Sequence, residues 1–60
     1  NETQAAVLLE IVHGKTTLAI SEYLNYSRGT VNSARLAGYR TLDVHSTSQL
    51  ISVIRAGIGL

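Results

Sequence analysis

The stretch from Ser27 to Val44 constrains the fold more than any other part of the sequence, because it has the pattern of one long amphipathic helix. Ser27 can cap that helix by accepting a hydrogen bond from an unpaired amide of the first turn. At about 100° per residue, apolar and small side chains collect on one face. That face contains Val31, Ala34, Gly38 and Leu42. We expect it to look inward, which leaves a mostly small and polar face free to meet another partner.

A first helix is expected from Glu2 to His13. Asn1 and Gln4 have the spacing of a capping box, in which two side chains bond to unpaired amides at the helix start. Gly14 can adopt the left-handed conformation that ends a helix without a steric clash. Four apolar residues recur at helical spacing and are expected to face the core: Ala5, Leu8, Leu9 and Val12.

A short second helix is expected after Thr16 or Thr17, either of which can cap it, and it runs to Leu24. Asn25 and Tyr26 then leave room for only a short turn before the long helix. Two helices joined in this way form a helix-turn-helix unit. The shared core of the first three helices is expected to contain Val31, Leu24, Ile20 and Leu8.

A last helix is expected after Ser46, which has the spacing of a capping box with Gln49. Its aliphatic content is high for so short a segment, and this excess suggests an interface with a second molecule. The residues concerned are Leu50, Ile51, Val53, Ile54 and Ile58. With four helices, no strand pattern and no proline, the sequence predicts an all-α fold, a small four-helix bundle containing a helix-turn-helix, as one domain over residues 1–60.

Composition narrows the classes of function. The chain has no cysteine, which excludes disulfides and zinc fingers and makes a reducing cytoplasm the default. The longest apolar run, Ala5 to Leu9, is far below the roughly 20 residues of a membrane span. His13 and His45 have no third ligand nearby, and nothing places a nucleophile beside a base, so we expect no metal, no cofactor and no enzyme. Because the chain begins at Asn1 and has no methionine, we expect it to be a fragment of a longer regulator.

Charge is distributed unevenly along the chain, although the net charge is only +1. No acidic residue lies between Glu22 and Asp43, whereas three arginines do: Arg28, Arg35 and Arg40. A helix that presents cations, an amide and a hydroxyl on its free face can lie in the major groove of DNA. A solvated amphipathic helix stays open as the alternative from this stretch alone.

The order and spacing of several short blocks resemble the LuxR/FixJ/GerE-type helix-turn-helix domain, the C-terminal DNA-binding part of bacterial transcription regulators. The blocks are Gly14-Lys15-Thr16, Ile20-Ser21, Leu24, Ser27-x-x-Thr30-Val31, Leu42-x-Val44 and Gln49-Leu50. The resemblance covers nearly the whole chain. It implies a scaffold helix over Thr17 to Leu24, a recognition helix over Ser27 to Leu42 in the major groove, and a dimer helix over Thr47 to Ala56.

Some positions depart from the family pattern. Asn32 and Ala34 stand where Lys and His are usual, so two DNA-facing groups of the family are expected to be missing. Gly38 replaces an apolar residue, and Glu10 stands where Leu is common. These departures support a second hypothesis, a protein-protein interaction module that keeps the helix-turn-helix fold but has lost DNA binding.

The first hypothesis, sequence-specific binding of double-stranded DNA in transcription regulation, assigns roles by residue. Base contacts are expected on the outward face, from Arg28, Gly29, Asn32, Ser33 and Leu36. Phosphate contacts are expected from Lys15, Thr16, Thr17, Ser27, Thr30, Arg35 and Arg40. Asn32 can pair bidentately with adenine, and Leu36 can lie against a thymine methyl, which predicts A·T pairs at the centre of each half-site.

The resemblance also implies the partners. A homodimer is expected through Leu50, Ile51, Ile54 and Ile58, with a second regulator as a possible hetero-partner and no membrane. The expected location is the bacterial cytoplasm, at the nucleoid when the protein is bound. Tyr26 is expected in the core, whereas Tyr23 and Tyr39 suit either the core or stacking on bases.

Overall fold

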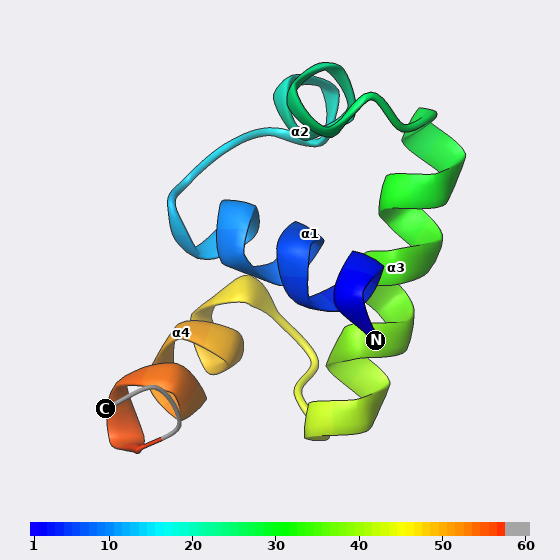
Figure 1. Ribbon diagram of the computed structural model, residues 1–60. Coiled ribbons are helices and arrows are strands. Elements are labelled where there is room, and N and C mark those ends of the chain that lie inside the picture. Colours follow the sequence, from blue (N-terminus) through cyan, green and yellow to red (C-terminus); the bar gives the residue numbers. More distant parts are fainter. Residues whose placement is uncertain (58–60) are drawn as a thin grey trace.

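The computed structural model describes residues 1–57 and contains four helices in that range, with no strand. They are α1 (Glu2–Val12), α2 (Thr17–Leu24), α3 (Arg28–Leu42) and α4 (Thr47–Ala56) (Figure 1). The expected all-α fold with a helix-turn-helix is confirmed. Within the described residues, no helix is both long and apolar enough to cross a membrane.

The expected helix starts are confirmed by side-chain caps. Asn1 Oδ1 accepts from the backbone N–H of Gln4 at 2.9 Å. Gln4 Oε1 in turn accepts from the amino group of Asn1, which completes the capping box. Thr16, rather than Thr17, caps α2, and Ser27 caps α3. Each cap satisfies an amide that would otherwise lack a partner in the first turn.

The start of α4 differs slightly from the expected capping box. Ser46 Oγ accepts from the backbone N–H of Gln49 at 3.1 Å, as expected. The Gln49 side chain instead accepts from the N–H of His45, one residue before the cap, at 2.6 Å. The box is therefore closed one residue earlier, and the amides around the helix start are still paired.

Left-handed residues define the helix ends. Gly14 has φ +85° just after α1, which ends at Val12, one residue before the expected His13. Asn25 ends α2 with φ 60°, and Asp43 ends α3 with φ 56°. Both are residue types that tolerate this conformation better than most. These compact ends keep the connections short and fix the directions of α2, α3 and α4.

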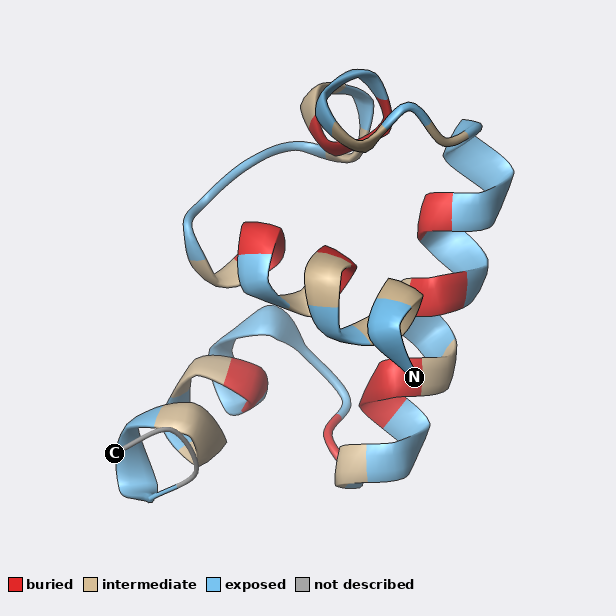
Figure 2. Ribbon diagram, viewed as in Figure 1, coloured by how far each residue is buried: buried red, intermediate tan, exposed pale blue. Residues whose placement is uncertain are grey.

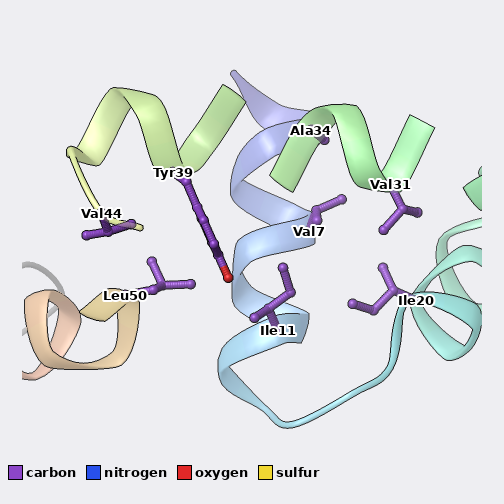
Figure 3. Packing of buried hydrophobic residues seen from close by; sticks show 8 residues of the cluster. All are labelled: Val7, Ile11, Ile20, Val31, Ala34, Tyr39, Val44 and Leu50. Carbon is purple, nitrogen blue, oxygen red and sulfur yellow. The ribbon is translucent and has the colours of Figure 1, made fainter. Parts of the chain in front are cut away.

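The core lies along the inward face of α1, which contacts all three other helices (Figures 1 and 2). Figure 3 shows the buried apolar side chains of this cluster: Val7, Ile11, Ile20, Val31, Ala34, Tyr39, Val44 and Leu50. Ile20 and Val31 are buried as expected, whereas Leu24 and Leu8 are half-buried and pack against the cluster. The expected shared core of the first three helices is therefore centred on α1.

The inward face of α1 differs from the expected one. Val7, Glu10 and Ile11 are buried, whereas Ala5 is exposed and Leu9 is 54% exposed. The two remaining residues of the expected face, Leu8 and Val12, lie half-buried at its margin. Apolar residues occupy almost every position from Ala5 to Val12, so the sequence contains two overlapping apolar faces of this helix. Contacts with the other three helices bury the face that contains Val7 and Ile11.

Gly38 explains how closely α1 and α3 approach. A Cβ atom at this position would lie 2.7 Å from Leu8 Cδ1 and 3.0 Å from Leu8 Cγ. The Leu8 side chain therefore occupies the space where other residues carry a side chain. The apolar residue that the family pattern has in α3 is replaced here by a side chain from α1.

Candidate nucleic-acid interface

The helix-turn-helix is formed by α2, α3 and a connection of three residues, Asn25 to Ser27. The left-handed Asn25 reverses the chain, and the Tyr26 N–H donates to the Ser21 carbonyl at 3.0 Å. Figure 1 looks nearly along α2 while α3 runs within the plane of view, so the two helices cross steeply. Tyr26 is half-buried and packs against the core, as expected. This packing fixes the angle at which α3 leaves the unit.

The outward face of α3 is free within the described residues. All five residues expected to contact bases are exposed, namely Arg28, Gly29, Asn32, Ser33 and Leu36. Leu36 is 49% exposed, which is high for a large aliphatic residue. Arg40 is exposed on the same face. The inward face of this helix carries Val31, Ala34 and Gly38, so the sequence assigned both faces of α3 correctly.

Ala34 requires a correction to the comparison with the family pattern. It stands at the usual His position, where the family pattern predicts a DNA-facing group, but it is buried in the core. Its place on the inward face of α3 follows from its helical spacing with Val31 and Gly38. Of the two departures, only Asn32 lies on the exposed face.

Hydroxyl groups lie at the starts of both helices of the unit. The Thr16 hydroxyl accepts from Ala19 N–H, and the Ser27 hydroxyl accepts from Thr30 N–H while it donates to Thr30 Oγ1. The hydroxyl hydrogens of Thr16 and Thr30 remain available to an outside acceptor such as a phosphate. Both residues are exposed, and Thr17 is half-buried. The unpaired backbone amides at these helix starts are further hydrogen-bond donors that a phosphate can accept from.

The arginines of α3 carry the positive charge of this surface. Within residues 1–57, the one ion pair joins Lys15 to Glu10, so Arg28, Arg35 and Arg40 have no acidic partner there. Arg35 is half-buried, and its guanidinium lies 5.5 Å from the centroid of the Tyr39 ring. Its Nη2 also donates to Asn32 Oδ1 at 2.8 Å.

Lys15, expected at a phosphate, is already paired in this structure. Its Nζ lies 2.7 Å from Oε1 of the buried Glu10 and 4.0 Å from the centroid of the Tyr23 ring. The distance makes this an ion pair, and that oxygen has no other partner among the described residues. Contact with Glu10 raises the pKa of Lys15. The Lys15 side chain remains 38% exposed, so a phosphate can still reach it.

The last helix supplies less apolar surface than the sequence suggested. Leu50 was expected at a dimer interface, but its exposure is 0%, so that assignment is wrong. Leu50 faces Tyr39 and Ile11 inside the protein's own core (Figure 3). Ile51 and Ile54 are half-buried, and Ile54 also packs against the core. Ile58 lies outside the described residues.

Three contacts that shape this surface were not predicted from the sequence. Tyr39, left open between core and base stacking, is buried, and its hydroxyl hydrogen-bonds Thr47 Oγ1 at 2.9 Å. The Glu10–Lys15 pair spans a turn and has no helical spacing that would reveal it. The bond between Asn32 and Arg35 has a recognisable signal, because residues three apart on a helix are neighbours. Tyr23, the other tyrosine whose role the sequence leaves undecided, is 67% exposed.

Two comparisons relate the chain to known proteins, a family and a curated relative. The GerE family profile, described as bacterial regulatory proteins of the luxR family, matches residues 2–54, which include all of α1, α2 and α3. The chain is 39% identical over 56 residues to the uncharacterized response regulatory protein YgeK of Escherichia coli strain K12. That alignment covers 92% of this chain but only 38% of the relative's length. No solved structure matches the chain significantly.

Proposed function

The chain belongs to the luxR family of bacterial regulatory proteins, and on that premise we propose that it binds double-stranded DNA sequence-specifically to regulate transcription. The observation that supports this most is the exposed face of α3, which combines arginines without acidic partners in residues 1–57 with an amide, a hydroxyl and a leucine. An α-helix fits the major groove, where each base pair presents its own pattern of donors and acceptors.

Phosphates would be bound around this helix by the groups at the starts of α2 and α3 and by flanking cations. The proposed set is Lys15, Thr16, Thr17, Ser27, Thr30, Arg35 and Arg40. Bases would be read by Arg28, Gly29, Asn32, Ser33 and Leu36. Gly29 has no side chain and would let α3 approach closely, which favours short groups such as Asn32 and Ser33 reaching base edges.

The active species would be a homodimer formed through α4 on two half-sites. Without Leu50, the proposed contact surface reduces to Ile51 and Ile54, together with Ile58 beyond the described residues. Such a surface is small compared with stable protein interfaces, so DNA would be needed to bring two copies together. The test is cooperative binding to a duplex with two half-sites, which Ile51→Glu should abolish while Ser52→Glu, at an exposed position of α4, should not.

Because the chain matches only part of its relative, we further propose that it is the DNA-binding domain of a longer regulator. The relative's name as a response regulatory protein makes a second regulator a reasonable hetero-partner. A DNA target would place the protein in the bacterial cytoplasm, at the nucleoid when bound. We propose no catalytic role, since the family consists of regulatory proteins.

A second function, protein binding without DNA binding, has one observation in its favour. Several large apolar side chains are exposed, namely Leu9, Leu18, Tyr23 and Leu36, and three of these lie outside α3.

Fluorescence anisotropy with mixed-sequence duplex DNA separates the two functions. A DNA binder loses affinity as salt rises, because bound phosphates release their counterions. Arg40→Ala, in the proposed phosphate set, should lower the salt slope by about one unit, whereas Arg55→Ala, on α4, should not. Absence of binding at about 50 mM salt would favour the protein-binding function.

A further inference from the structure

Two neighbouring side chains on α3 are joined in a way that fixes their orientation. Arg35 Nη2 donates to Asn32 Oδ1 at 2.8 Å, across one turn of the helix. A guanidinium has only donors, so the atom that faces it must be the carbonyl oxygen of the carboxamide. Asn32 is exposed, and its amide nitrogen is therefore the end of the carboxamide left free for another molecule.

Arg35 is held in turn by the buried part of the protein. Its guanidinium carbon lies 5.5 Å from the centroid of the Tyr39 ring, within the range of a cation–π contact. Tyr39 is buried, and its hydroxyl is bonded to Thr47 at the start of α4. Because this ring cannot move freely, the planar guanidinium on it has a defined position. A chain of contacts thus leads from α4 through Tyr39 and Arg35 to Asn32.

In the described part of the chain, Arg35 has no acidic neighbour that would compete with Asn32 for its guanidinium. Within residues 1–57, no carboxylate lies within ion-pairing distance of its guanidinium. The bond to Asn32 is charge-assisted, which makes it stronger than a bond between neutral groups. Arg35 therefore does more than offer a cation to a phosphate, because its side chain also determines which end of Asn32 is presented.

We propose that Arg35 is a positioning residue that turns the amide nitrogen of Asn32 outward, so that α3 reads an acceptor-rich base edge. This inference rests on the proposed function, in which α3 lies in the major groove. Guanine offers two acceptors there, N7 and O6. Bidentate pairing with adenine, the pairing expected from the sequence, needs Asn32 Oδ1 to accept from the adenine N6 group. Arg35 already donates a charge-assisted bond to one of the two lone pairs of that oxygen, so the oxygen is a weaker acceptor for adenine, whereas both amide hydrogens stay available for the two acceptors of guanine. Asn32 accordingly selects guanine over adenine.

The test measures base preference with the 60-residue chain and a pool of duplexes whose central base pairs are randomised. Sequencing of the bound fraction gives the preference at each position, and anisotropy on single-substitution duplexes gives the affinities. The position read by Asn32 is the one whose preference disappears in Asn32→Ala. Discrimination there is expected to be about 5- to 150-fold in favour of guanine, the range of a good side-chain contact to a base.

Arg35→Lys separates positioning from phosphate binding, because lysine keeps the charge but lacks the planar fork that bonds Asn32 and stacks on Tyr39. The variant should lower discrimination at that position about fivefold or more and leave the salt slope unchanged. Adding Asn32→Ala to it should cost no further discrimination. Arg55→Lys makes the same chemical change at an exposed position of α4, outside the proposed DNA contacts, and should leave both the preference and the salt slope intact. Thermal melting verifies that each variant is folded.

Three results would overturn the inference. One is an adenine preference in the unmodified chain at the Asn32 position. Another is an Arg35→Lys variant whose affinity falls by the same factor for every duplex while its base preference is unchanged. That result would mean that Arg35 has only a structural or phosphate-binding role. The third, no binding of the unmodified chain to any duplex at about 50 mM salt, would overturn the proposed function together with the inference.

Discussion

The Glu10–Lys15 ion pair gives a prediction that links an unusual core residue to DNA affinity. Glu10 is buried, and its carboxylate lies 2.7 Å from a lysine that we place at a phosphate. A phosphate must compete with this carboxylate for the ammonium. Glu10→Gln removes the charge with almost no change of shape, so Lys15 should become fully available to DNA.

The magnitude follows from counterion release. Each phosphate neutralised changes the slope of log affinity against log salt by about 0.9. Between 50 and 200 mM salt, one additional full contact therefore adds a loss of affinity of about 3.5-fold. We expect the slope of Glu10→Gln to be steeper than that of the unmodified chain by up to about 0.9. Its affinity at low salt should be higher for all sequences alike.

The assay is an anisotropy titration on one mixed-sequence duplex over this salt range. Glu2→Gln is the matched control, because it removes the same charge from an exposed position at the start of α1. It should leave the slope unchanged. Lys15→Ala should lower the slope more in the Glu10→Gln background than in the unmodified chain. Equal slopes for Glu10→Gln and the unmodified chain would contradict this prediction, since Glu10 would then not compete with a phosphate for Lys15.

Three further predictions concern stability. Ile20→Ala should lower the free energy of unfolding by about 2–5 kcal/mol in a denaturant titration, whereas Leu18→Ala, on the exposed side of α2, should change it by under about 0.5 kcal/mol; similar losses would contradict the packing. Gly38→Ala should destabilise the unmodified chain, because the added methyl group clashes with Leu8. In a Leu8→Ala variant the same change should stabilise the fold by up to about 1 kcal/mol, because alanine favours a helix more than glycine does. A change of stability with the same sign in both chains would contradict this contact. Because the pKa of Lys15 is raised, its pairing with Glu10 should stabilise the fold fully below pH 10.5 and progressively less as pH rises through the folded-state pKa. Melting temperatures should therefore fall more steeply above pH 10.5 in the unmodified chain than in Glu10→Gln.

The sequence predicted the helix boundaries well because the caps are local. Asn1 with Gln4, Ser27 and Ser46 each bond to an amide within one turn, so the determining residues are adjacent in the sequence. The two faces of α3 were also predictable, since its apolar residues have one clear spacing. Local chemistry of this kind requires no knowledge of the neighbouring helices.

The remaining features depend on residues distant in the sequence or on choices between equivalent faces. Leu50 and Ile51 are both aliphatic, and only the docking of α4 decides that Leu50 enters the core. The inward face of α1 was ambiguous for the same reason. Tyr39 became an anchor because Thr47 follows at the start of the next helix. Contacts of this kind determine which side chains remain for DNA.

Contact between the exposed face of α3 and DNA can be observed residue by residue with two-dimensional ¹H–¹⁵N NMR of the chain during titration with a duplex pool. Every non-proline residue reports separately, so the spectrum maps the contact surface. We predict that the largest shifts fall at the start of α2 and on the outward face of α3, including Asn32 and Leu36, and that they diminish when salt is raised. Shifts confined to exposed residues elsewhere, such as Leu9 on α1, or no shifts at low salt, would contradict the account.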